Sequence, residues 1–163
     1  MIPALPFRRS PEVSLLRTRH PVGIITAAQA TDRLTDMYGQ VLRQAEASLG
    51  RLILEFLDAP VHRVVISGVL RVTEPNGLIS VHPDPSTWEV PEGQILNRAV
   101  ETQQVSAAGA LRLEIAGTTL HVDSDPHHEA WEVRGSDGWL LACLPGGGLS
   151  LWTPSLGRIA AAQ

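Results

Sequence analysis

The chain has 163 residues, of which 44% are hydrophobic and 18% charged, a composition typical of globular proteins and unlike that of disordered chains. All 13 basic residues are arginine, and the net charge is −4. No basic cluster is present to supply the phosphate contacts that nucleic-acid binding requires. The absence of lysine excludes Schiff-base chemistry and the lysine of a phosphate-binding loop.

The single cysteine, Cys143, cannot form an internal disulfide, and this suits a reducing compartment. Residues 1–20 alternate prolines and arginines with apolar residues and lack the apolar core of a secretory signal. No stretch approaches the roughly 20 apolar residues that span a bilayer. We therefore expect a cytoplasmic protein that binds neither a membrane nor nucleic acid, and no cofactor is expected because no cofactor motif is present.

The first 25 residues hold prolines at a spacing that breaks helices and central strands. We predict an irregular, proline-rich arm over residues 1–25 and a single β-rich domain over residues 26–163. The prolines are Pro3, Pro6, Pro11 and Pro21.

Apolar residues at three- and four-residue spacings predict an amphipathic helix over residues 26–49. The residues on its expected buried face are Leu34, Met37, Val41, Leu42, Ala45 and Leu49. Thr26 and Gln29 fit a capping box at its start, and Thr31 is an alternative N-cap. Gly50 stands where a helix commonly ends in a left-handed conformation. We expect this helix to cover an edge or an open end of a sheet.

After Gly50 the sequence predicts about eight short strands separated by turn signals. Asn76-Gly77 and Pro145–Gly148 are typical of hairpin turns, and residues 91–100 could hold a short helix. Because few helices separate the strands, the sheet should be antiparallel. We predict a mostly β, α+β fold, a curled antiparallel sheet in a barrel-like or sandwich arrangement. The strands are expected at residues 52–57, 61–72, 78–82, 110–115, 118–122, 130–134, 139–144 and 149–152.

The densest group of potential metal ligands is His121, Asp123, Asp125 and His127. Neighbouring His127 and His128 would point in opposite directions in an extended chain, and the calcium-loop pattern is incomplete. We therefore favour an Asp-Pro turn with exposed polar side chains over a metal site.

Candidate partner-binding residues follow in the same segment. His127, His128 and Glu129 are expected in an exposed loop, while Glu132 and Arg134 share one face of the next strand as a solvated pair. No catalytic role is assigned to them. The tryptophans of the last hairpins, Trp131, Trp139 and Trp152, are expected to pack together.

The segment Asp125-Pro126-His127-His128-Glu129-Ala130-Trp131-Glu132-Val133 is followed by Gly138, Leu144-Pro145-Gly146-Gly147 and Leu151-Trp152. This pattern resembles the domain of unknown function 6188 family, small uncharacterised proteins of high-GC bacteria. The resemblance extends over about residues 50–153, and it implies a β-rich fold but no activity. Residues 1–49 exceed the family pattern, and Gly148 stands where an acidic residue is usual.

These observations favour a non-catalytic protein-binding module, such as an immunity protein or an inhibitor of a bacterial toxin. The acidic chain suits electrostatic steering towards a basic partner. A homodimer is also considered. The alternative is a small-molecule-binding β-barrel or a hydrolase of unrecognised type, with a site near His121, His127 and Trp131.

Overall fold

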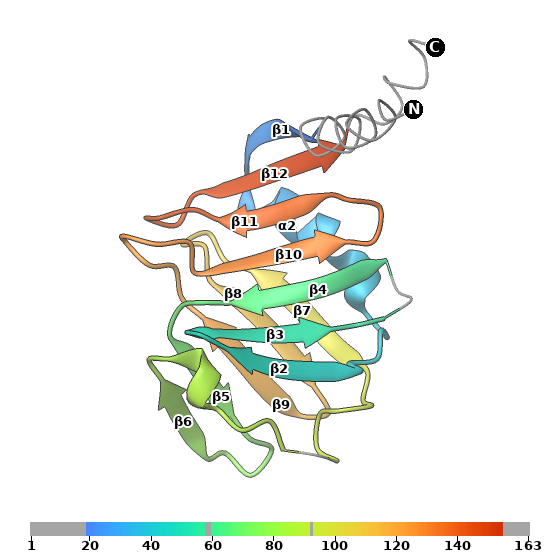
Figure 1. The fold of residues 1–163 in the computed structure, drawn as a ribbon, viewed down its shortest axis with the longest axis vertical. Helices are drawn as coiled ribbons and strands as arrows, with labels where there is room; N and C mark the ends of the chain where they lie inside the picture. The colour runs from blue at the N-terminus through green and yellow to red at the C-terminus, as the bar shows by residue number, and fades with distance from the viewer. Residues whose placement is uncertain (1–18, 58–59, 92, 155–163) are drawn as a thin grey trace, which may run out of the picture.

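A computed structural model describes residues 19–57, 60–91 and 93–154. Its larger sheet has seven strands in the order β1-β12-β11-β10-β4-β3-β2, and all neighbours are antiparallel (Figure 1). The strands are β1 (Arg19–Ile25), β2 (Gln44–Ser48), β3 (Arg51–Glu55), β4 (Val61–Ile66), β10 (Trp131–Gly135), β11 (Leu140–Cys143) and β12 (Leu149–Pro154).

The smaller sheet has five strands in the order β6-β5-β9-β8-β7 and is also antiparallel. Its strands are β5 (Leu70–Thr73), β6 (Ile79–His82), β7 (Val100–Val105), β8 (Leu111–Ile115) and β9 (Thr118–Val122). The helical segments are short: α2 (Ala27–Arg33) and the 3₁₀ turns η1 (Thr35–Met37) and η2 (Pro85–Thr87). No helix in the described ranges is long and apolar enough to cross a membrane.

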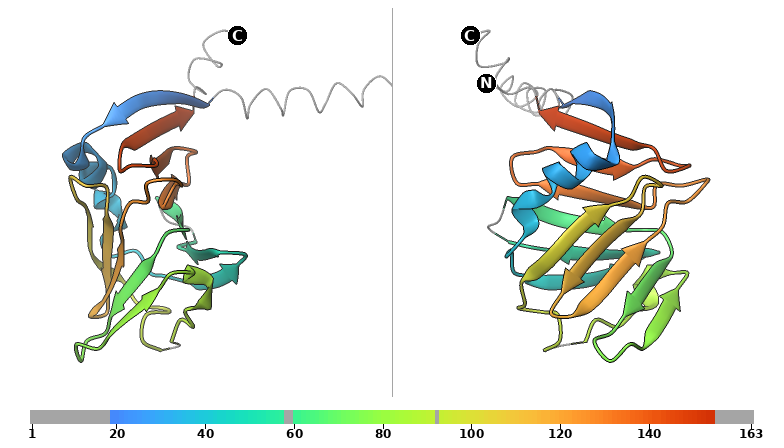
Figure 2. Two further views of the ribbon diagram at one scale, coloured as in Figure 1. Left: turned by 90° about the vertical axis from the view of Figure 1, so that its left-hand side faces the viewer. Right: turned by 180° about the vertical axis from the view of Figure 1, so that it is seen from behind.

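The two sheets form two layers, and α2 lies beside β7 in the layer of the smaller sheet (Figure 2). The smaller sheet covers the side of the larger sheet that includes β3 and β4, whereas α2 covers the side that includes β11 and β12 (Figure 2). Alternating burial along β8 and β10 directs one face of each sheet inward. Fully buried side chains from both sheets and from the segment after α2 include Leu34, Met37, Leu42, Leu54, Phe56, Leu113 and Trp131.

The predicted capping box is confirmed at the start of α2. The Thr26 hydroxyl oxygen accepts a hydrogen bond from the Gln29 N–H at 3.1 Å, and Gln29 Oε1 accepts one from the Thr26 N–H at 2.8 Å. Thr31, the alternative N-cap, instead lies inside the helix, where its hydroxyl oxygen accepts a hydrogen bond from the Val105 N–H at 3.0 Å. That bond attaches α2 to β7.

The helix predicted over residues 26–49 is wrong beyond Arg33, where α2 ends. Gly39 adopts a φ of +82°, and the chain turns there to bury Gln40. The Gln40 amide accepts a hydrogen bond from the Val61 N–H at 2.9 Å and donates one to the Val61 carbonyl at 3.0 Å. A continuous helix could not make these bonds, and tertiary contacts override local propensity here.

The second half of that predicted helix forms β2, which pairs with β3. Leu49, expected on the buried helix face, is 96% exposed in the turn between these strands. Gly50 does adopt a left-handed conformation, with a φ of +69°, but it belongs to a hairpin and not to a helix end.

The irregular arm predicted over residues 1–25 is wrong for residues 19–25, which form β1 and pair with β12. The register shifts between Pro21 and Gly23, and a proline is tolerated at such a place on an outer strand. Residues 1–18 lie outside the described part of the chain.

The described ranges form twelve strands where about eight were predicted. Strands β1 and β2 were not predicted. In addition, the single strand predicted over residues 61–72 is divided into β4 and β5 by a break at Gly68. A Cβ at Gly68 would lie 2.9 Å from the Ala130 Cβ, so this close approach excludes a side chain. The short helix expected at 91–100 is also wrong: residues 93–97 form turns and β7 begins at Val100.

Both predicted hairpin turns are confirmed: Asn76-Gly77 joins β5 to β6, and Pro145–Gly148 joins β11 to β12. The described strands do not close into a barrel, because each sheet keeps two outer strands. Of the predicted arrangements, the structure is the two-layered sandwich.

Candidate binding groove

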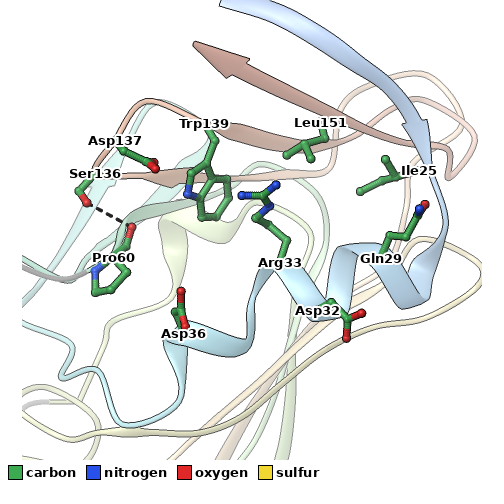
Figure 3. A pocket seen from close by; sticks show the side chains of 10 residues that line it. All are labelled: Ile25, Gln29, Asp32, Arg33, Asp36, Pro60, Ser136, Asp137, Trp139 and Leu151. Atoms are coloured by element: carbon green, nitrogen blue, oxygen red, sulfur yellow. Dashed lines mark hydrogen bonds between the residues drawn. The ribbon is translucent and has the colours of Figure 1, made fainter. Parts of the chain in front are cut away.

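A groove with a volume of about 860 Å³ lies between α2 and the strands at the β12 side of the larger sheet (Figure 3). Its apolar lining consists of Ile25, Pro60, Trp139 and Leu151. Its polar lining consists of Gln29, Asp32, Arg33, Asp36, Ser136 and Asp137.

The helical wall follows from the amphipathic pattern of α2. Ala30 and Leu34, one helical turn apart, are fully buried against the core. This orientation leaves Asp32 and Asp36 exposed and Arg33 half-buried at the groove. The polar residues of this segment therefore form one side of a cavity and do not merely face solvent.

The opposite wall comes from the turn between β10 and β11. The Gly135 N–H donates a hydrogen bond to the Trp139 carbonyl at 2.9 Å, and the Ser136 N–H donates one to the Pro60 carbonyl at 2.9 Å. A Cβ at Gly135 would lie 2.0 Å from Trp139 Nε1. Glycine at position 135 is thus required for the indole to rest against the backbone of the turn.

The centre of the groove is an Arg33–Trp139 pair. The guanidinium carbon of Arg33 lies 5.4 Å from the centre of the indole ring, within the range of a cation–π contact. In the described ranges Arg33 forms no ion pair, although Asp32 and Asp36 lie below it on either side and Asp137 lies beyond the Trp139 ring (Figure 3). The carboxylates outnumber the guanidinium by three to one among the lining residues, so the groove is electronegative.

The three tryptophans of the last hairpins do not form the single cluster that was predicted. Trp131 is buried between the sheets and donates its indole N–H to the Gly109 carbonyl at 2.9 Å. Trp152 is half-buried, and its indole N–H donates to Ser150 Oγ at 3.3 Å. Trp139 alone faces the groove. The sequence did not mark Trp139 as a groove residue, because the helical wall that faces it comes from the distant N-terminal segment.

The predicted loop residues precede β10, whereas the groove residues of the β10–β11 turn follow it, so the two lie at opposite ends of this strand. His127, His128 and Glu129 are all exposed. Asp125 Oδ1 accepts hydrogen bonds from the backbone N–H groups of His127 at 2.7 Å and His128 at 3.0 Å. The bond from His127 is the main cause that lowers the pKa of Asp125. The loop is therefore an Asx turn.

Glu132 and Arg134 lie on the outer face of the larger sheet, where their side chains form an ion pair with an N–O distance of 3.2 Å. A second pair, Glu55 and Arg63, lies on the neighbouring strands at 3.1 Å. The candidate partner-binding residues are thus divided between a loop and the sheet face of the strand that follows it.

The candidate metal ligands are also divided. His121 Nε2 lies 2.8 Å from Asp123 Oδ1 on the outer side of the smaller sheet, and Arg71 approaches the same carboxylate at 3.8 Å. Asp125 is directed to its own loop. No three potential ligands converge within the residues that the structure describes. Of the residues proposed for the alternative small-molecule site, Trp131 is buried, His121 is half-buried and His127 is exposed.

The motif residues have a structural role at the contact between the two sheets. The Gly146 N–H donates to the Asp125 carbonyl at 2.8 Å. The turn at Gly147 packs against Gly109, where an added Cβ would lie 2.6 Å from the Gly147 carbonyl oxygen. Gly109 also accepts the hydrogen bond from Trp131. The Asp-Pro, Trp and Pro-Gly-Gly parts of the motif therefore contact one another, directly or through Gly109, where the turns of the two sheets pack together.

The fold and the groove together define a two-layered antiparallel β protein with a negatively charged, partly apolar groove. The chain belongs to the family of unknown function DUF6188, which matches residues 49–153. No curated protein and no solved structure matches the chain. The family match begins at the turn before β3, so the helical wall of the groove comes from residues that precede it.

Proposed function

We propose that the protein is a non-catalytic protein-binding module whose groove between α2 and the β10–β11 turn receives a basic and apolar segment of a partner protein. The observation that carries the proposal is the lining of the groove. Ile25 and Pro60 offer apolar surface beside the nearly buried Trp139 and Leu151, and Asp32, Asp36 and Asp137 offer exposed carboxylates around it. A partner segment with both basic and apolar side chains complements both features.

Charge favours this class of partner over an acidic one. Arg33, the only cation among the described residues that line the groove, is already directed to the Trp139 ring. The net charge of the chain is −4, so the long-range field attracts basic proteins as well. Binding is also favoured over catalysis, since acid–base catalysis uses carboxylates in sheltered settings and all three groove carboxylates are exposed.

Calorimetric titration of the full chain with an acetylated peptide of alternating leucine and arginine tests the groove. Asp36→Asn combined with Asp137→Asn should weaken binding by about tenfold, because two attractive charges are removed. The matched control combines Glu46→Gln and Glu89→Gln, which remove two exposed carboxylates elsewhere. Equal loss in both double variants, or equal binding of a leucine–glutamate peptide, would overturn the proposed site.

The specific role that we propose is that of an immunity protein or inhibitor of a bacterial toxin. A toxin encoded beside this chain should bind it directly and should kill cells only when the chain is absent. The groove double variant should lose this protection, whereas the control double variant should keep it. Protection that survives in the groove variant would place the interface elsewhere.

A further inference from the structure

The hairpin of β5 and β6 carries an unusual concentration of exposed apolar side chains. Leu78, Ile79 and Val81 are 61%, 63% and 55% exposed, and Val69, the residue before β5, is 44% exposed. These are four of the eight large hydrophobic residues that are exposed in the described ranges. The hairpin extends past the β2 side of the larger sheet, and β6 is an outer strand (Figure 1). This is an apolar patch on a strand edge.

The other outer strands carry features that oppose edge-to-edge pairing. Strand β1 contains Pro21 and a register shift, β2 exposes Glu46, and β7 exposes Glu101 beside its own register shift. Prolines, bulges and charges are the usual protection of sheet edges. The residues of β6, Ile79–His82, include no proline, carboxylate or arginine, and their register with β5 is regular.

The backbone of β6 is also oriented for pairing. The Glu74 N–H donates to the Leu78 carbonyl at 2.8 Å, which closes the hairpin. Because hydrogen-bonded and non-hydrogen-bonded pairs alternate in an antiparallel ladder, Thr73–Ile79 is a non-hydrogen-bonded pair. The same alternation applies to Val81, two residues later. The N–H and C=O groups of Ile79 and Val81 therefore point away from β5.

We propose that β6 pairs with β6 of a second copy of this chain, antiparallel and about a twofold axis at Ser80. Ile79 of each copy then lies opposite Val81 of the other, and each such pair exchanges both of its backbone hydrogen bonds. The two smaller sheets become one continuous sheet, and the homodimer has a closed, isologous interface.

A second copy fits this edge for two reasons. An identical strand supplies apolar side chains opposite Ile79 and Val81 and introduces no like charges. Moving the axis to Val81 would place Pro83, which has no N–H, opposite Ile79. The register about Ser80 therefore pairs more of the free backbone N–H and C=O groups of β6. The strand is short, so the interface falls below the roughly 800 Å² per partner of stable complexes, and the dimer is a weak one.

Sedimentation velocity over about 10 μM to 1 mM of the full chain tests this proposal, because weak dimers appear only at high concentration. The wild-type chain should dimerise as concentration rises, and more so at high salt, which screens the repulsion between acidic copies. Val81→Glu should weaken dimerisation by at least about tenfold. In the monomer the new carboxylate lies opposite Arg71, so the hairpin is retained.

Ile79→Pro should have the same effect, because it removes an N–H that the monomer does not use. Leu49→Glu is the matched control: it adds the same charge at a 96% exposed leucine in another hairpin and should leave dimerisation unchanged. Circular dichroism confirms that each variant is folded. The proposal is overturned if the chain stays monomeric, and the edge of β6 is then left for a strand of another protein. It is also overturned if the chain dimerises and Val81→Glu leaves that dimer intact. Neither result bears on the groove.

Discussion

Gly109 and Gly147 pack backbone against backbone, and a Cβ added to Gly109 would lie 2.6 Å from the Gly147 carbonyl oxygen. Gly109 lies between β7 and β8 of the smaller sheet, and Gly147 lies between β11 and β12 of the larger one. This contact joins the two layers at the end of the sandwich where the motif residues meet. The motif is thus explained by packing between turns.

Gly109→Ala should destabilise the protein by at least about 2 kcal/mol in urea unfolding, because it combines the steric overlap with a φ of +89°. Gly146→Ala is the matched control: its φ is +88°, but nothing lies within 4 Å of the added Cβ. It should lose only about 1 kcal/mol, the backbone cost alone. Equal losses would show that the contact between the turns contributes nothing.

Gln40→Leu should cost about 2–4 kcal/mol, because it leaves both the N–H and the C=O of Val61 without their buried partner. The exposed Gln104 offers a comparison, and Gln104→Leu should change stability by less than about 0.5 kcal/mol. Chemical unfolding of the two variants measures the difference. A small effect at Gln40 would contradict its role in ending the helical segment.

Arg33→Gln should strengthen binding of the leucine–arginine peptide by about three- to tenfold, because it removes the one cation found among the groove-lining residues that the structure describes. Arg51→Gln makes the same change in net charge at an exposed position outside the groove and should have little effect. Calorimetry gives the affinities, and tryptophan fluorescence checks that Trp139 keeps its environment. Weaker binding to Arg33→Gln would argue against a basic partner.

Asp125 should make stability depend on pH in the acid range. Its pKa is lowered from the usual 3.8, first by the hydrogen bond from the His127 N–H. The carboxylate therefore stabilises the folded state above pH 3.8, and this contribution is lost as the pH falls through the lower pKa of the folded state. Asp125→Ala should be less stable than the wild type at pH 7, and the gap should narrow towards pH 2. If the stabilities of the wild type and Asp125→Ala differ by the same amount at every pH, the predicted contribution of the Asp125 carboxylate is refuted.

Cys143 should be unreactive in the folded protein. Its thiol lies in the core, and burial raises its pKa above the usual value of 9.0. Because the thiolate is the reactive form, a disulfide reagent at pH 8 should modify Cys143 only after denaturant is added. Rapid labelling of the native chain would contradict the buried position.

Local signals in the sequence were sufficient for features that depend on neighbouring residues. The capping box at Thr26, the hairpins at Asn76-Gly77 and Pro145–Gly148, and the strands of the C-terminal half follow from side-chain chemistry and from alternation over a few positions. Motif residues also predicted family membership. These features need no distant partner.

Features that depend on distant segments were decided only in the tertiary structure. The apolar spacing through Leu34, Met37 and Leu42 is real, since all three are buried, but the Gln40–Val61 bonds and the pairing of β2 with β3 end the helix early. The groove needs Arg33 and Trp139 from opposite ends of the chain, so no local pattern marks it. Helical periodicity reports which residues are buried, whereas the partner segment decides the conformation in which they are buried.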